Sequence, residues 1–243
     1  CAAAPARRPR ADDARAAARG RRLLERTSVL LPGHVRAAMN CTSCHLDAGR
    51  RPGALSWIGA AAGYPTYVAR AARVDTLEDR INECFARSMN GSPLALGSPE
   101  MRDIVAYMDR LSRGVAAGTR SPARGLAKLP PGPAPDRAAG RRLYAERCAR
   151  CHAADGSGLI TGGGSPEIPP LWGARSFNIG AGMARQRTAE AFIRRFMPLD
   201  RPGSLSDREA RDIADFVIHQ PRPDFPGKER DWPRGGKPAD ARY

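Results

Sequence analysis

The sequence predicts an all-α protein built from two similar domains in tandem. Two blocks of the 243-residue chain repeat each other, each with an opening helix, a cysteine motif, a long loop region and a closing helix. The closing helices carry capping signals and apolar stripes, and no alternating pattern is long enough to predict a substantial strand. A chain of this length can form two small domains with separate cores.

Three segments define the repeat, and each recurs after 107 to 120 residues. The matching pairs are GRRLL 20–24 with GRRLY 140–144, CTSCH 41–45 with CARCH 148–152, and RDIVAY 102–107 with RDIADF 211–216. The glycine that begins each opening segment, Gly20 or Gly140, lacks a side chain and would allow the opening helix to approach the closing helix closely. The sequence therefore predicts the same helix crossing in both blocks.

Local signals mark the closing helices. Ser206 and Glu209 form a capping box in the second block, where Pro221 ends the helix. Ser98 can cap the corresponding helix of the first block, and Pro99 suits its first turn. The apolar stripes are Ile104, Met108 and Leu111 in the first block and Ile213, Phe216 and Val217 in the second.

Composition divides the remaining chain into connecting segments. The N-terminal residues are Ala, Arg, Pro and Asp without an apolar period, and TRSPARGLAKLPPGPAP is rich in Pro and Gly. We therefore expect five parts: an N-terminal tether over 1–19, a first domain over 20–118, a linker over 119–135, a second domain over 136–221, and an irregular C-terminal tail over 222–243.

The CxxCH motif in each block is the attachment signature of a covalent haem. Its two thiols reach the two vinyl groups of one porphyrin, and the adjacent histidine lies beneath the iron. A zinc site would need a further ligand pair, and a thioredoxin-type motif would need a βαβ context. We therefore expect two tandem class I cytochrome c domains carrying two haem c groups. The expected attachment residues are Cys41, Cys44, Cys148 and Cys151, and the expected proximal iron ligands are His45 and His152.

The sixth ligand of the second haem is expected to be a methionine. Met197 is followed by Pro198 and lies just before the closing helix, where class I cytochromes place their methionine ligand. Met183, in the sequence GAGM, is the rival candidate. We favour Met197 because of its position and the proline that follows it.

The sixth ligand of the first haem has two candidates, Cys84 and Met89. A helix is expected here, with Asp75 as its cap and Glu78 at the third position. Its apolar stripe is Leu77, Ile81 and Phe85, and a second stripe is Arg80, Cys84 and Ser88. A nearby arginine favours the thiolate of Cys84, which would be a strong ligand for ferric haem. The repeat, however, places Met89 opposite Met197, so both candidates stay open.

The chain is strongly basic, with a formal net charge of +15 and only three lysines among 40 basic residues. This balance predicts anionic partners such as an acidic protein, an anionic membrane surface or small dianions. Nucleic acid is not expected, because the arginines are spread along the chain and no nucleic-acid-binding motif occurs.

The first residue, Cys1, is followed by alanines and a Pro/Arg/Ala stretch that is similar to the start of a mature lipoprotein. We expect acyl chains on Cys1 and a flexible tether after it, the alternative being an arbitrary starting point of the sequence. Because haem c is attached outside the cytoplasm, we expect a periplasmic protein, with a membrane anchor if Cys1 is lipidated.

Six longer motifs together suggest a family. They are CTSCHLDAG 41–49, RINECFARSMNG 80–91, PPLWG 169–173, SFNIGAGM 176–183, FMPL 196–199 and GKPAD 236–240. On these motifs the chain resembles the dihaem thiosulfate dehydrogenases that form tetrathionate, from residue 20 nearly to the C-terminus. The first domain is also similar to the haem-bearing A subunit of the periplasmic sulfur-oxidising system.

The resemblance assigns roles to individual residues. It implies that Cys84 ligates the first iron and Met197 the second. It also implies that Arg80, Ser88 and Arg70 hold the sulfur anion. Some members of the family carry Lys or Asn immediately before the methionine. This chain has Phe196 there, and a phenylalanine cannot replace the methionine as an iron ligand.

The implied reaction joins two thiosulfates into one tetrathionate and releases two electrons. The first haem passes them to the second and on to an external acceptor, such as a small cytochrome c or a high-potential redox protein. The reverse reaction would reduce tetrathionate. Cys84 would act as nucleophile as well as ligand, and Arg80, with Arg87 or Arg70, would offset the repulsion of two dianions. Two alternatives stay open: a dihaem electron-transfer cytochrome without a substrate, and a sulfur-carrier cytochrome that acts on a partner protein's cysteine.

Overall fold

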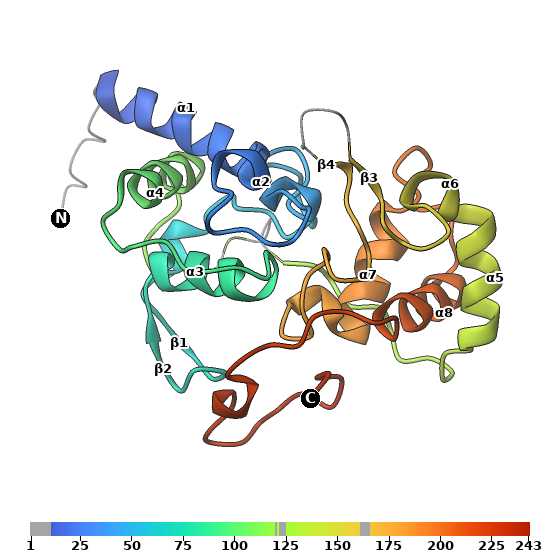
Figure 1. Ribbon diagram of the computed structural model, residues 1–243. Coiled ribbons are helices and arrows are strands. Elements are labelled where there is room, and N and C mark those ends of the chain that lie inside the picture. Colours follow the sequence, from blue (N-terminus) through green and yellow to red (C-terminus); the bar gives the residue numbers. More distant parts are fainter. Residues whose placement is uncertain (1–10, 120, 122–124, 161–165) are drawn as a thin grey trace.

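The computed structural model describes residues 11–119, 121, 125–160 and 166–243, and it is mostly helical (Figure 1). The helices of the first half are α1 (Ala11–Glu25), α2 (Thr27–Leu30), α3 (Leu77–Arg87) and α4 (Pro99–Leu111). Those of the second half are α5 (Arg137–Arg147), α6 (Ala149–His152), α7 (Gln186–Phe196) and α8 (Asp207–Ile218). Single 3-10 turns are η1 (Cys41–Ser43), η2 (Ala61–Gly63), η3 (Gly182–Ala184) and η4 (Lys228–Arg230). The prediction of two helical domains in tandem is confirmed.

Among the described residues, the strands form two short antiparallel hairpins. In the first, β1 (Thr66–Val68) pairs with β2 (Arg73–Asp75), and Tyr67 lies opposite Val74. In the second, β3 (Leu159–Ile160) pairs with β4 (Pro166–Ile168). Neither hairpin is large enough to form a sheet core of its own. Within the described ranges, no helix has both the length and the apolar character needed to cross a membrane.

Both domains use a glycine at the crossing of the opening and closing helices. In the first domain α1 packs on α4, and a Cβ added to Gly20 would lie 1.9 Å from the carbonyl oxygen of Asp103. In the second, α5 packs on α8, and a Cβ added to Gly140 would lie 2.0 Å from the carbonyl oxygen of Asp212. The predicted close approach is therefore confirmed in both copies of the repeat.

The predicted tether over 1–19 is wrong for the residues that the structure describes. Helix α1 begins at Ala11, and Ala17 is buried against the first-domain core. The run of alanines carries no obvious apolar period, but alanine is the strongest helix former and its methyl group fits a close helix contact. Cys1, the expected lipidation site, lies outside the described residues.

The caps of the closing helices agree with the sequence analysis, whereas the cap of α3 does not. Ser98 accepts a hydrogen bond from the Met101 backbone N–H, and a capping box opens α8. Helix α3 is capped by Thr76 instead of the predicted Asp75, because Asp79 completes a capping box with Thr76. The carboxylate of Asp75 is buried and accepts a hydrogen bond from Arg73 Nε at 2.7 Å.

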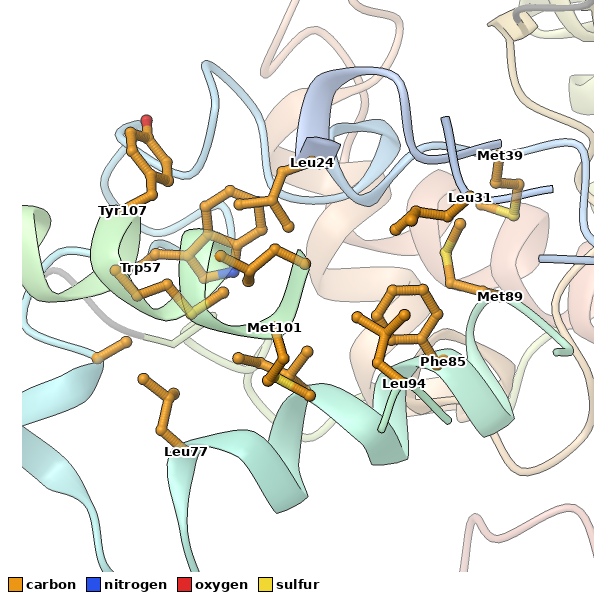
Figure 2. Packing of buried hydrophobic residues seen from close by; sticks show 14 of the residues in the cluster. Leu24, Leu31, Met39, Trp57, Leu77, Phe85, Met89, Leu94, Met101 and Tyr107 are labelled. Carbon is orange, nitrogen blue, oxygen red and sulfur yellow. The ribbon is translucent and has the colours of Figure 1, made fainter. Parts of the chain in front are cut away.

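The first-domain core also takes in a segment from the second half of the chain. Figure 2 shows this cluster, with Trp57 and Leu24 on one side and Phe85, Met89 and Leu31 on the other. The second-half members of the cluster are Phe177, Ala181 and Ala184, with Met183 packed at its edge. A further apolar cluster joins the domains through Ala54, Phe192 and Phe196. The two domains therefore share buried surface.

Hydrogen bonds fix the segment that enters the first domain. The fully buried side chain of Asn178 donates to the carbonyl oxygen of Ala86 at 2.9 Å, and its backbone N–H donates to that of Arg87 at 3.2 Å. Both acceptors lie in the last turn of α3, where carbonyl groups lack helical partners. Residues of the second half thus complete the C-terminal end of this helix.

The C-terminal tail is irregular apart from η4, and it returns to the first domain. It runs from α8 below α7 toward the β1–β2 hairpin before it turns back (Figure 1). Phe225 and Trp232 are its buried apolar residues. Asp231 and Asp240 bind arginines of the first and second domains respectively. The tail therefore contacts both halves of the protein.

Candidate functional site

The first CxxCH motif is held in a tight turn by polar contacts from the preceding helix. Cys41 begins η1, and its backbone N–H donates to the hydroxyl of Thr27 at 3.2 Å. The same hydroxyl lies 3.3 Å from the sulfur of Cys41. Asn40 caps the turn and accepts a hydrogen bond from the Ser28 backbone N–H at 3.1 Å. Both thiols of the motif pack at the edge of the first-domain core.

His45 is oriented by a backbone carbonyl and an aromatic ring. Its Nδ1 lies 2.5 Å from the carbonyl oxygen of Leu55, and its ring stacks on Trp57 with 4.7 Å between the centroids. Because a carbonyl oxygen can only accept, Nδ1 carries the proton and Nε2 keeps a free lone pair. Burial, together with the positive charge of Arg80, lowers the pKa of His45 to about 4. The imidazole is therefore neutral at physiological pH, as an iron ligand must be.

The second motif repeats this arrangement in the other domain. Cys148 follows the end of α5, and His152 is the last residue of α6. The Nδ1 of His152 lies 3.0 Å from the carbonyl oxygen of Pro169, and burial lowers the pKa of this histidine. Here too the proton is on Nδ1 and Nε2 is free. Cys151, unlike Cys148, is exposed at the surface.

The two pockets fit covalently bound haem. In each, a pair of thiols precedes a histidine whose Nδ1 is bound and whose Nε2 is free. Burial raises the pKa of both Cys41 and Cys44 to about 12 and that of Cys148 to about 11, which reflects apolar surroundings. Aromatic side chains border the second pocket, with the rings of Tyr144 and Trp172 4.9 Å apart. A porphyrin requires such an apolar enclosure with one basic nitrogen.

The polar stripe predicted on α3 is present, and it brings Arg80 and Cys84 into contact. The Nη1 of Arg80 lies 3.2 Å from the sulfur of Cys84. A negative charge on Cys84 raises the pKa of Arg80, and it also adds to the raised pKa values of Cys41 and Cys44. The sulfur of Cys84 therefore lies within electrostatic range of both thiols of the first CxxCH motif. Ser88 ends the stripe one turn later as the C-cap of α3.

The rival ligand Met89 lies in the first-domain core. Its side chain is buried beside Phe85 and Leu31 (Figure 2). Its carbonyl oxygen accepts hydrogen bonds from the backbone N–H groups of Arg36 and Ala37. These contacts describe a packing residue, whereas Cys84 is only partly buried and carries a cationic partner. The assignment of Cys84 over Met89 stays a prediction.

Both methionine candidates of the second domain lie near the domain interface. Met197 follows α7 as its C-cap and packs against the cluster of Ala54, Phe192 and Phe196. Met183 lies on η3 and packs against that cluster and the first-domain core. Met183 therefore contacts the first-domain core as well, whereas Met197 contacts only the interface cluster among the described clusters, and Met197 remains our predicted ligand.

Arg70, the fourth residue expected at the sulfur site, is held by the second half of the chain. Its Nη1 donates to the carbonyl oxygen of Gly180 at 2.9 Å, and its guanidinium lies 4.6 Å from the ring centroid of Trp232. Its Nε lies 3.7 Å from Asp231. The structure therefore joins Arg80 to Cys84 directly and places Arg70 in a neighbouring ion-pair network.

The acidic residues of that network, Asp231 and Glu83, were not predicted from the sequence. Asp231 accepts hydrogen bonds from both terminal nitrogens of Arg87, each at 2.8 Å. Glu83 lies between Arg80 and Arg87, at 3.6 and 3.9 Å from their nitrogens. The spacing of Glu83 and Arg87 along one helix could have indicated their contact. No local signal pairs Arg87 with an aspartate 144 residues away.

Family models match both domains of the chain. A model described as SoxA/TsdA, cytochrome c domain, matches residues 34–117. A second, described as cytochrome C oxidase, cbb3-type, subunit III, matches residues 135–217. The two matches cover the two CxxCH motifs, and together they support two haem c groups.

Curated proteins and a solved structure show the same relationship over nearly the whole chain. A thiosulfate dehydrogenase of Allochromatium vinosum is 46% identical over 211 residues, covering 85% of this chain and 78% of the relative. One of Psychrobacter arcticus is 42% identical over 224 residues, covering 92% of this chain and 68% of the relative. The solved thiosulfate dehydrogenase (TsdBA) of Marichromatium purpuratum, in its as-isolated form, superposes with a TM-score of 0.85 at 37% identity. That match covers 92% of this chain, which spans half the length of the solved one. The chain therefore belongs to the thiosulfate dehydrogenase family of c-type cytochromes and is an oxidoreductase with two haem c groups.

Proposed function

We propose that this protein oxidises two thiosulfates to one tetrathionate at Cys84. The observation that carries the proposal is the 3.2 Å contact between Arg80 and the sulfur of Cys84, which lies within electrostatic range of the thiols of the first CxxCH motif. The guanidinium places a positive charge beside the sulfur, and a thiolate is the nucleophile of sulfur chemistry. A cationic site of this kind suits a small sulfur dianion.

We assign the iron-binding residues from the same geometry. His45 and His152 are the proximal ligands, because each keeps Nε2 free while a backbone carbonyl holds Nδ1. Cys84 would also hold the iron of the first domain, and Met197 that of the second. The thiols of both CxxCH motifs attach the porphyrins. When bound, the two haems supply the redox chemistry by which electrons leave the sulfur site toward an acceptor.

The chemistry at Cys84 divides into two steps that balance. In the first, the Cys84 thiolate and one thiosulfate form a Cys–S–S–SO₃⁻ adduct, and two electrons leave. In the second, the sulfane sulfur of another thiosulfate attacks the adduct sulfur that is bonded to the sulfur of Cys84. The S–S bond to Cys84 breaks, which releases tetrathionate and restores the thiolate. No proton is consumed in either step. The sulfur of Cys84 therefore serves as nucleophile first and as leaving group second.

Fixed positive charge lowers the electrostatic cost of bringing these anions together. Two dianions repel strongly in a partly dehydrated site, and a guanidinium placed beforehand opposes that repulsion without reorganisation. Arg80 supplies this charge at the sulfur, while Ser88 offers a hydroxyl one turn away. Arg70 supplies a second cation from the neighbouring network. The same residues would serve the reverse reaction.

The electrons leave through the second domain to an external protein. Cys151, one of the two thiols that would attach the second haem, is exposed at the surface. The acceptor would be a small cytochrome c or a high-potential redox protein. Because haem c is attached outside the cytoplasm, we place the protein in the periplasm. A lipid anchor at Cys1 stays a prediction.

A steady-state assay with thiosulfate and ferricyanide tests the function. The holoprotein should reduce ferricyanide only when thiosulfate is present and should form one tetrathionate for every two electrons transferred. The main alternative, a plain electron-transfer cytochrome, is favoured by the alignment of Met89 with Met197 in the repeat. It predicts reversible reduction of both haems without any tetrathionate.

A further inference from the structure

The C-terminal tail places a carboxylate between two arginines of the first domain. Asp231 binds both terminal nitrogens of Arg87 at 2.8 Å and lies 3.7 Å from Arg70 Nε. The side chain of Asp231 is only 6% exposed, and those of Arg87 and Arg70 are 10% and 17% exposed. A bidentate arginine–carboxylate pair at this depth has a fixed geometry. Breaking it would leave two buried cations close together.

The tail also holds the guanidinium of Arg70 from a second side. Trp232 lies 4.6 Å from it as a cation–π partner, while Gly180 accepts a hydrogen bond from it at 2.9 Å. Arg70 itself belongs to the loop of the β1–β2 hairpin, which offers little packing of its own. Burial and the charge of Arg87 lower the pKa of Arg70, and Asp231 opposes this shift. The orientation of Arg70 therefore depends on Gly180 of the second domain and on two residues that follow that domain, Asp231 and Trp232.

The same carboxylate connects to Cys84 through α3. Glu83 lies within 4 Å of both Arg80 and Arg87, so these arginines share its carboxylate. The two terminal nitrogens of Arg87 bind Asp231, and Arg87 contacts Glu83 only at 3.9 Å. Without Asp231, Arg87 would turn to Glu83, its remaining carboxylate partner among the described contacts. Glu83 would then be drawn from Arg80, the residue that contacts the sulfur of Cys84.

We infer that Asp231 is a positioning residue for the sulfur-anion site, and that the tail completes this site. The inference rests on the proposed function, because it takes Arg80 and Arg70 as the cations that hold thiosulfate. Asp231 does not touch the substrate. It keeps Arg70 in place directly and Arg80 through Arg87 and Glu83. The anion site of the first domain is thus built partly from residues after the second domain.

The test compares two aspartate-to-asparagine variants of the tail in the full-length holoprotein. Asp231→Asn removes the charge between Arg87 and Arg70. Asp240→Asn removes a comparable carboxylate, which binds Arg185 at 2.6 Å and touches neither α3 nor Arg70. Thiosulfate binding is measured by calorimetry on protein kept fully reduced, so that no turnover occurs. The spectrum of the first haem and the melting temperature are recorded for both variants.

We expect Asp231→Asn to weaken thiosulfate binding about tenfold, as loss of a buried ion-pair partner would, with the haem spectrum unchanged. Asp240→Asn should bind thiosulfate like the wild type even if it melts earlier. Should Asp231→Asn fail to fold, Trp232→Leu keeps the charge and removes the ring over Arg70, and we expect about threefold weaker binding.

Equal thiosulfate affinities in the wild type, Asp231→Asn and Trp232→Leu would overturn the inference. So would weakened binding in both Asp231→Asn and Asp240→Asn, because that result would indicate a general effect of the tail. The proposed function fails separately, if the wild-type holoprotein forms no tetrathionate in the ferricyanide assay. The binding measurement does not depend on turnover, which keeps the two failures distinguishable.

Discussion

The Nη1 of Arg80 lies 3.2 Å from the sulfur of Cys84, one helical turn further along α3. This contact turns a cysteine that could be a packing residue into a thiol with its own cation. The guanidinium of Arg80 also places a positive charge, which can attract the anionic substrate, on the same face of α3 as the sulfur. The first two predictions separate these two roles.

Cys84→Gly should leave both haems attached and lower tetrathionate formation by at least about a thousandfold, because the nucleophile is lost. The low-spin ferric signal of the first haem should disappear, since thiolate ligation would be its source. Met89→Ala is the matched comparison, and it should lower stability by about 2–4 kcal/mol without changing that signal. Near-normal turnover in Cys84→Gly, together with an altered spectrum in Met89→Ala, would show that the ligand assignment is wrong.

Arg80→Ala should mainly raise the KM for thiosulfate, about 10- to 100-fold, because it removes charge but not the sulfur chemistry. The effect should shrink at high ionic strength, because salt screens the attraction between the arginine and the dianion. Arg113→Ala removes an exposed arginine of the same domain and should leave the KM unchanged. The idea would fail if both variants shifted the KM equally, since net charge alone would then explain the effect.

Met197→Ala should abolish the near-infrared band that arises from a thioether bound to ferric haem. We expect Met197 to be the thioether ligand because it lies at the end of α7, next to the cluster that joins the domains. Met183→Ala should keep the band and lose packing against the first domain. If Met183→Ala removes the band instead, the ligand of the second haem is Met183.

Gly20→Ala and Gly140→Ala should each destabilise the protein by about 1–3 kcal/mol, as overpacking does in a tight contact. The new methyl group would meet a backbone carbonyl oxygen at 1.9 or 2.0 Å, so the crossing helices would have to separate. Gly33→Ala is the control, since a Cβ there meets nothing within 4 Å. The free energy of unfolding of the three holoproteins in denaturant gives the comparison. Equal values for all three would contradict the role of the crossing glycines.

Features encoded locally could be predicted from the sequence. The capping boxes, the stripe of Leu77, Ile81 and Phe85, and the paired crossing glycines all follow from spacing along one element. The cap of α3 was misassigned by one residue because Asp75 and Thr76 are both good caps. The residue at the third helical position determines which of the two is the cap, and Asp79 at that position forms a capping box with Thr76.

Contacts between residues far apart in the sequence could not be predicted. Arg87 and Asp231 are 144 residues apart, and the tail composition suggests only an irregular segment. Asn178 likewise binds the end of α3 from 92 residues away. The helical start at Ala11 was missed for another reason, since an alanine-rich surface helix shows little hydrophobic periodicity before its partner is known.

The return of the tail sets an order of maturation. Arg70 and Arg87 are synthesised before the second domain, whereas their counter-charge at Asp231 is synthesised after it. Before the second half is made, these arginines lack the Asp231 carboxylate, and the end of α3 lacks the Asn178 side chain that binds it. The first domain is therefore completed only after the second has been synthesised, so a protein cut short before residue 231 would carry a first domain in which the anion site that we propose is incomplete.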